Sequence, residues 1–324
     1  MKFESAQNII RKKSAEVSPN AAIERVDQEL LANGVLVERK LTDLDGEREI
    51  MGMFNRFKFS PPVSEHDIVF FSGFTNRVQN FESILPQIAL DTDSSVHGLN
   101  ELPGVRTGDA LYDHERQFSP YKEQMSKAIT VAEFAAYDGI SDMDVIAHSQ
   151  GAIESLIMAV TNPGLVKNMV LVNPAGIIPM TEKELTMQGL KEFVTGVGKG
   201  GEGATFDQKI ADVIENFGVL KDSRATIADF SQNENMVDLI QSIREHGTKV
   251  GIIMTDQDKL FEITKMYDQL TDDKSVPLYD RLDGHKILAG NHGSILSQDN
   301  LHEITDLMTE LRDREPQAPK STFG

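Results

Sequence analysis

A serine, two aspartates and a histidine have the types and the spacing needed for nucleophilic acyl chemistry. Ser149 stands among small residues in the stretch Ala147–Gly151, after an apolar run that starts at Met143 and before a helical pattern that follows directly. This context is typical of a nucleophile elbow, a tight strand-to-helix turn that exposes one side chain. The usual pattern is G-x-S-x-G, and alanine replaces the first glycine here. Small residues are needed because the strand and the helix nearly touch.

A serine hydroxyl is a weak nucleophile at neutral pH unless a histidine, oriented by a carboxylate, takes its proton. In folds that contain an elbow, the chain order is serine, acid, histidine. Asp256 and Asp258 both follow the apolar run 249–254, and His292 lies in the stretch 289–294 after a later run. The order therefore favours a nucleophile over an ordinary turn serine. The order leaves open which aspartate orients the histidine. The remaining aspartate could cap a helix or bind backbone groups.

Apolar periodicity indicates which elements must position these residues. Expected strands cover residues 34–41, 50–59, 67–71, 95–99, 143–148, 169–172, 249–254 and 286–289, and expected helices cover 21–32, about 81–88, 120–137, 151–160, 261–270 and 301–311. The first two strands have turn residues between them and predict an antiparallel hairpin. Asn300 and Glu303 are spaced like a capping pair before the last helix. Strands that alternate with helices predict an α/β fold, with a mainly parallel central sheet flanked by helices.

One block interrupts the alternation. From residue 177 to 246 the pattern is helical, with a capping box at Thr181 and Glu184 and an apolar stripe from Phe206 to Phe217. The sequence thus predicts a core of residues 1–176 and 247–312, an inserted helical cap or lid at 177–246, and a disordered tail at 313–324. The glycine-rich run 196–203 would allow one cap helix to move.

Composition excludes several classes of function. The chain has 324 residues and a formal charge of -19, which disfavours binding to nucleic acid or anionic membranes. It has no cysteine, so disulfides and thiolate metal sites are excluded. No apolar run is long enough to span a bilayer and no signal peptide is recognisable at the start, so we expect a cytoplasmic protein without stable membrane insertion.

No cofactor or metal is expected. Residues 196–201 match G-x-G-x-x-G formally, but no strand precedes them and no helix starts on them, so a flexible linker is the better interpretation. No cluster of His, Asp and Glu has the spacing of metal ligands. Oligomeric state cannot be derived from the sequence.

Together these motifs resemble the α/β-hydrolase superfamily from about residue 34 to 311. The stretch 147–151 looks like its elbow, 290–293 like its histidine loop, and 173–176 like the segment that leads into its cap. Residues 255–261 resemble its G-x-x-D acid turn with Thr255 in place of glycine, which points to Asp258. The resemblance implies a catalytic Ser149, Asp258 and His292, with His285 a surface or strand residue.

The tetrahedral intermediate of acyl transfer also needs donors for its oxyanion. One is expected to be the backbone N–H of Gln150, the residue after the nucleophile. The resemblance implies the Phe74 N–H as the second donor, although Ser72 replaces the familiar histidine of that loop. His148, beside the nucleophile, is expected to be structural because an elbow turns adjacent side chains apart.

The resemblance implies a serine hydrolase of the carboxylesterase or lipase type. It would cleave an ester or thioester through an acyl-enzyme, and its cap would select a small-molecule acyl substrate with an apolar portion. Acyl transfer on the same three residues is one alternative. A non-catalytic binding protein of the same fold is another, since one fold hosts many functions.

Overall fold

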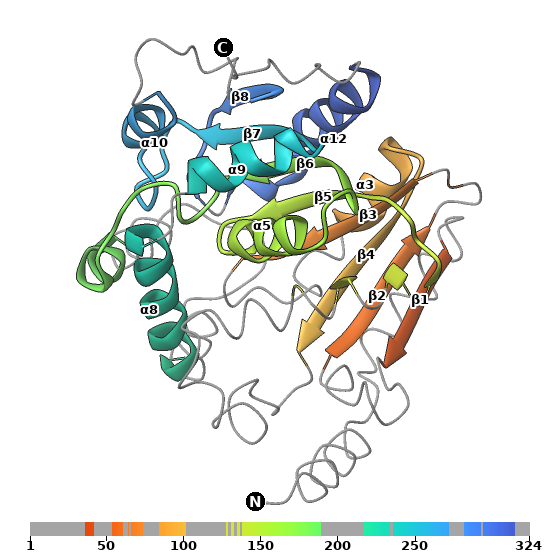
Figure 1. Cartoon of the computed structure of the whole chain (residues 1–324), viewed down its shortest axis with the longest axis horizontal. Coiled ribbons are helices and arrows are strands. Elements are labelled where there is room, and N and C mark those ends of the chain that lie inside the picture. The colour runs from red at the N-terminus through yellow and green to blue at the C-terminus, as the bar shows by residue number, and fades with distance from the viewer. Residues whose placement is uncertain are drawn as a thin grey trace, which may run out of the picture.

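The computed structural model describes residues 36–41, 54–60, 64, 66–73, 84–101, 128, 131–132, 135–136, 138–188, 217–233, 236–271, 282–292 and 294–314. Within these ranges eight strands form one sheet in the order β1-β2-β4-β3-β5-β6-β7-β8 (Figure 1). The strands are β1 Leu36–Leu41, β2 Phe54–Ser60, β3 His66–Phe71, β4 Ser94–Glu101, β5 Met143–His148, β6 Val166–Val172, β7 Lys249–Thr255 and β8 Gly284–Leu288. The expected hairpin is confirmed, because β1 pairs antiparallel with β2.

The sheet is mainly parallel. β2 also pairs antiparallel with β4, whereas every pairing from β4 to β8 is parallel. The helices are α3 Leu85–Asp91, α5 Gly151–Thr161, α8 Phe217–Asn233, α9 Met236–Glu245, α10 Ile263–Leu270 and α12 Gln298–Asp313, with a 3₁₀ turn η3 at Ser294–Leu296. The predicted α/β architecture is confirmed.

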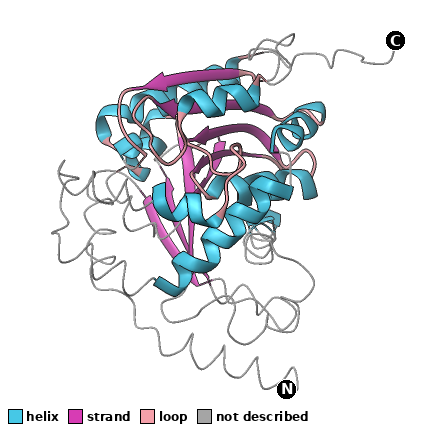
Figure 2. Cartoon of the chain, turned by 90° about the vertical axis from the view of Figure 1, so that its left-hand side faces the viewer, coloured by secondary structure: helices cyan, strands magenta, loops and turns pink. Residues whose placement is uncertain are grey.

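Helices cover both faces of the sheet (Figure 2). Successive strand residues point to opposite faces, so on β5 the side chain of Val145 enters one core and that of Ile146 enters the other. α5, α9 and α10 pack on the Val145 face, while α3 and α12 pack on the Ile146 face. Burial on both faces explains why the central strands are almost wholly apolar.

Parallel strands carry the site residues to one edge of the sheet. The carboxyl ends of β5, β6, β7 and β8 all lie on that edge. In the pairings, His148 lies opposite Val172 and Thr255 lies opposite Leu288. The loops that follow these strands contain Ser149, Asp258 and His292. Open α/β sheets place their ligand sites at this edge.

One predicted helix start is wrong. Asn300 lies inside α12, which begins at Gln298 with Ser297 as its N-cap. The Asn300 N–H donates to the Ser297 carbonyl at 3.1 Å. The apolar stripe begins only at Leu301, so periodicity does not reveal the polar first turn. Strand β8 likewise begins two residues before the expected position, at Gly284.

The predicted cap is described in part. The capping box is confirmed: the Thr181 N–H donates to Glu184 Oε2 at 2.8 Å, and the Glu184 N–H donates to Thr181 Oγ1 at 3.2 Å. α9 packs on α5 and β7, in the layer that covers the core sheet. The division into core and cap at residues 177 and 246 stays a prediction. Several predicted features lie outside the described ranges: helix 21–32, residues 196–203, Phe206 and the tail beyond residue 314.

Candidate active site

Ser149 sits in the turn between β5 and α5 with a backbone φ of 54°. This left-handed conformation is costly for a residue with a side chain and is found mainly where the surroundings enforce it. Here the Ser149 N–H donates to the Val172 carbonyl at 3.0 Å, and the Ser149 carbonyl accepts from Ala175 at 3.0 Å. The turn is therefore tied to the end of β6.

Two glycines allow the elbow to form. A Cβ on Gly151 would lie 2.5 Å from the carbonyl oxygen of Phe71, so the helix start has no space for any side chain. A Cβ on Gly73 would lie 2.9 Å from Ser149 Cβ and 2.9 Å from His148 Nδ1. The loop after β3 thus runs directly against the serine.

A chain of two hydrogen bonds joins the three predicted residues. His292 Nε2 lies 3.0 Å from Ser149 Oγ, and His292 Nδ1 lies 2.8 Å from Asp258 Oδ2. A carboxylate only accepts, so Nδ1 carries the proton and Nε2 has the free lone pair that faces the serine hydroxyl. The arrangement has the geometry that base-assisted attack requires.

The Asp258 side chain is fully buried, with 0 % exposure. Its second oxygen, Oδ1, accepts hydrogen bonds from the backbone N–H groups of Leu260 at 2.8 Å and Phe261 at 2.9 Å. These donors fix the carboxylate in one orientation toward His292. The Phe261 ring stands edge-on to the imidazole, with 5.2 Å between the ring centres.

Asp256 has a different position. Its Oδ1 accepts a hydrogen bond from the Gly290 N–H at 3.0 Å, and the Gln257 N–H donates to the Gly290 carbonyl at 2.9 Å. The structure thus brings Asp258, and not Asp256, against the histidine. Asp256 binds the backbone of the loop that carries His292.

A side-chain clamp that sequence reasoning missed joins β6 to β7. Asn173 Nδ2 donates to Thr255 Oγ1 at 2.9 Å, and the Thr255 N–H donates to Asn173 Oδ1 at 2.9 Å. Both residues are buried, and Asn173 has a φ of 42°. The clamp fixes the elbow side of the site relative to the acid turn. The two residues are 82 positions apart, so no local pattern could reveal it.

The remaining predicted residues have these positions. His285 lies in β8 opposite Ile252, with its ring near Tyr267. Gln150 is the N-cap of α5, so its backbone N–H has no intrahelical partner. Phe74 lies outside the described residues, directly after Gly73.

His148 is buried beside the site. Burial, and then the nearby charge of His292, lower the pKa of His148 from 6.5 to about 3. It is therefore neutral near pH 7.

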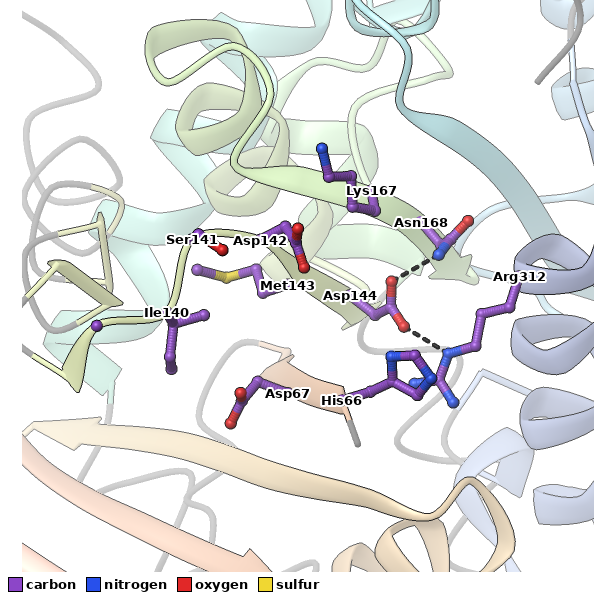
Figure 3. A pocket seen from close by; sticks show the side chains of 11 residues that line it. His66, Asp67, Ile140, Ser141, Asp142, Met143, Asp144, Lys167, Asn168 and Arg312 are labelled. Carbon is purple, nitrogen blue, oxygen red and sulfur yellow. Dashed lines mark hydrogen bonds and ion pairs between the residues drawn. The ribbon is translucent and has the colours of Figure 1, made fainter. Parts of the chain in front are cut away.

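A hollow of about 330 Å³ lies at the opposite edge of the sheet, where β3, β5 and β6 begin. Figure 3 shows Asp144 between Asn168 and Arg312, with distances of 2.7 Å to the amide nitrogen and 2.6 Å to the guanidinium. The Arg312 guanidinium also donates to the Thr92 carbonyl and to Ser94 Oγ. These contacts anchor α12 to the amino ends of the strands, away from Ser149.

Among the described residues, no three His, Asp or Glu side chains gather closely enough to hold a metal ion. Each helix in the described ranges is too short or too polar to cross a membrane.

Solved structures show the same fold at low sequence identity. A carboxylesterase from Nitrososphaera gargenis is 16 % identical with a TM-score of 0.53, over 79 % of this chain and 96 % of the other. A proposed lipase from Acinetobacter baumannii is 15 % identical with a TM-score of 0.59, over 92 % and 99 %. A bacterial membrane phospholipase A is 14 % identical with a TM-score of 0.54, over 96 % and 94 %.

No family model matches the chain, and no curated protein matches it by sequence. The structural likeness therefore concerns the fold, which is the α/β-hydrolase fold.

Proposed function

We propose that this chain is a serine hydrolase that cleaves an ester or thioester through an acyl-enzyme on Ser149. The observation that carries the proposal is the chain of hydrogen bonds from Ser149 Oγ to His292 Nε2 and from His292 Nδ1 to Asp258 Oδ2, at 3.0 and 2.8 Å. A binding protein has no need for a buried carboxylate that orients a histidine toward a serine held at a φ of 54°.

In the proposed reaction, Ser149 Oγ attacks the acyl carbon while its proton passes to His292 Nε2. The imidazolium is stabilised by Asp258, which stays ionised. The bond from the acyl carbon to the leaving oxygen, or to the leaving sulfur of a thioester, then breaks, and the alcohol or thiol takes the proton from Nε2. Water then attacks the acyl-enzyme and gives a proton to Nε2. The bond from the acyl carbon to Ser149 Oγ breaks, Oγ takes that proton, and the carboxylic acid leaves.

The oxyanion of each intermediate would be bound by backbone donors. The Gln150 N–H is the first, since Gln150 is the N-cap of α5 and its N–H has no intrahelical partner. The Phe74 N–H is proposed as the second, because the loop at Gly73 runs directly against Ser149. Losing one such donor typically costs about 10²–10³ in rate.

We also propose that the acyl group has an apolar portion. The segment after β6 starts against the elbow, through the hydrogen bond between Ala175 and Ser149, and continues into the buried apolar residues Ile177, Ile178 and Met180. α8 is tied to this segment, since Gln232 Nε2 donates to the Met180 carbonyl at 2.9 Å. Buried apolar residues that follow the Ala175 contact with Ser149 so closely in the chain support a substrate with hydrocarbon character.

Pre-steady-state kinetics with p-nitrophenyl esters test the function. The wild type should release a burst of p-nitrophenol of about one per chain, because an activated ester acylates the serine faster than the acyl-enzyme is hydrolysed. Ser149→Ala should lose the burst and the turnover with its thermal unfolding unchanged. Turnover by Ser149→Ala at the wild-type rate would contradict the proposal.

A further inference from the structure

Two histidine rings lie against each other at the site, and the mechanism above uses one of them. The centres of the His148 and His292 rings are 5.1 Å apart, and the ring planes are inclined by 35°. His148 Nε2 lies 3.3 Å from the backbone carbonyl oxygen of His292. His148 is 3 % exposed, so these contacts form away from water.

The partner of His148 fixes its tautomer. A carbonyl oxygen only accepts, so the proton of the neutral ring must be on Nε2. Nδ1 then carries a lone pair, and it has no hydrogen-bond partner among the described residues. Nδ1 faces the loop after β3, because a Cβ on Gly73 would lie 2.9 Å from it. The ring is thus confined between Gly73 on one side and His292 on the other.

The loop that carries His292 is anchored on two sides. The acid turn holds it through Asp256 and Gln257, which bind the backbone of Gly290. From the elbow side, His148 holds the carbonyl of His292 itself. The second anchor acts on the residue whose Nε2 must stay within hydrogen-bond distance of Ser149 Oγ.

We propose that His148 is a positioning residue, whose Nε2–H holds the His292 carbonyl and so keeps the base at its working distance from Ser149. This inference rests on the proposed function for its kinetic consequences, but the geometry it describes can be measured without turnover. A hydrogen bond at this place matters because a displacement of about 1 Å between reacting groups can cost roughly 100-fold in rate.

The neutral state of His148 is part of the role. In the proposed reaction His292 becomes an imidazolium, and a second cation 5.1 Å away would oppose its formation. Burial and the charge of His292 both disfavour protonation of His148. The described group whose charge acts on His148 is His292, which contacts Asp258 in turn.

A matched pair of variants isolates the donor. Gln can place an N–H where His148 Nε2 lies, whereas Met has the same length and no donor. We expect His148→Met to lower kcat by roughly 10- to 100-fold with KM within about twofold, and His148→Gln to recover most of the loss. His285→Gln replaces a different histidine, in β8, and should leave kcat unchanged. Wild-type kcat in His148→Met, or equal loss in the Gln and Met variants, would overturn the inference.

Two NMR measurements do not depend on activity. The proton of His292 Nδ1 should give a sharp downfield resonance in the wild type that broadens or disappears in His148→Met. In the ¹⁵N-labelled wild type, His148 should stay in the neutral Nε2–H form from pH 5 to 8, which needs no variant to fold. An unchanged Nδ1 resonance, a proton on His148 Nδ1, or protonation of His148 in this range would contradict the inference. If the wild type neither turns over esters nor reacts with probes, the proposed function fails while these resonances still decide the role of His148.

Discussion

Asp258 Oδ2 lies 2.8 Å from His292 Nδ1, across 34 residues of sequence. Asp256, two positions earlier on the same turn, instead accepts a hydrogen bond from the backbone of Gly290. The two carboxylates therefore support the histidine in different ways, one through its ring and one through its loop.

This difference predicts unequal effects of the same substitution. Asp258→Asn should lower kcat by about 10³–10⁴, since an amide that donates to Nδ1 would stabilise the wrong tautomer. Asp256→Asn should stay within about tenfold of the wild type, because its amide oxygen can still accept from Gly290. Steady-state kinetics on one ester substrate measure both. A crippled Asp256→Asn enzyme with an active Asp258→Asn enzyme would reverse the assignment.

The elbow should not accept a side chain at Gly151. A methyl group there would lie 2.5 Å from the Phe71 carbonyl oxygen, which belongs to the backbone of a central strand. We expect Gly151→Ala to lower the free energy of unfolding by about 3 kcal/mol or more, because the main chain must shift to relieve this contact.

The control for this variant is Gly247→Ala. Gly247 has a φ of 94° but nothing within 4 Å of its Cβ position, so only the backbone cost of about 1–2 kcal/mol applies. Urea unfolding measures both changes. Equal destabilisation by the two variants would show that the contact with Phe71 is unimportant.

The lowered pKa of His148 predicts that the free energy of unfolding depends on pH. Its pKa is about 3 in the folded protein and 6.5 ordinarily, so below pH 6.5 the unfolded chain binds a proton that the folded chain refuses. Stability is therefore lost as the pH falls, and between pH 7.5 and 5.5 this group contributes a loss of about 1.4 kcal/mol.

Urea unfolding of His148→Gln should lack this contribution, so its stability should fall by about 1.4 kcal/mol less than that of the wild type over the same range. His302→Gln, which changes a side chain that is 62 % exposed, is the matched control and should follow the wild type. Parallel curves of unfolding free energy against pH for the wild type and His148→Gln would contradict the prediction.

Charge should shape substrate choice. The chain carries a formal charge of -19, and the segment next to the elbow is apolar. We expect kcat/KM for p-nitrophenyl butyrate to exceed that for p-nitrophenyl hemisuccinate, an ester of equal chain length with an added carboxylate, by roughly tenfold or more. Added salt should narrow the difference. A kcat/KM for the hemisuccinate ester equal to or above that for the butyrate ester would contradict the proposed apolar acyl site.

Local patterns in the sequence predicted the parts of the fold that depend on nearby residues. The capping box spans the four positions from Thr181 to Glu184, and β5 and α5 can be recognised from the single run from Met143 to Thr161. The start of the last helix is harder to predict from the sequence, because the polar first turn of α12 has no apolar residue to mark it. Its predicted start at Asn300 was too late for that reason.

Contacts between distant segments could not be predicted in this way. Arg312 binds Asp144 across 168 residues, and Asn173 binds Thr255 across 82. Neither pair belongs to a motif, since the first depends on how α12 packs against β5 and the second on which strand ends the sheet brings together. The separate roles of Asp256 and Asp258 have the same cause, because the position of Gly290 relative to the turn is set by the β7–β8 pairing.

The central claim is that Ser149 is an activated nucleophile, and covalent capture tests it most directly. The wild-type protein should react with a fluorophosphonate to one adduct per chain, and peptide mass spectrometry should locate the adduct on Ser149. Ser149→Ala should remain unlabelled, and His292→Ala should label more slowly by orders of magnitude, because the proton acceptor 3.0 Å from Oγ is gone. An adduct on another residue, or labelling of Ser149→Ala at the wild-type rate, would contradict the account.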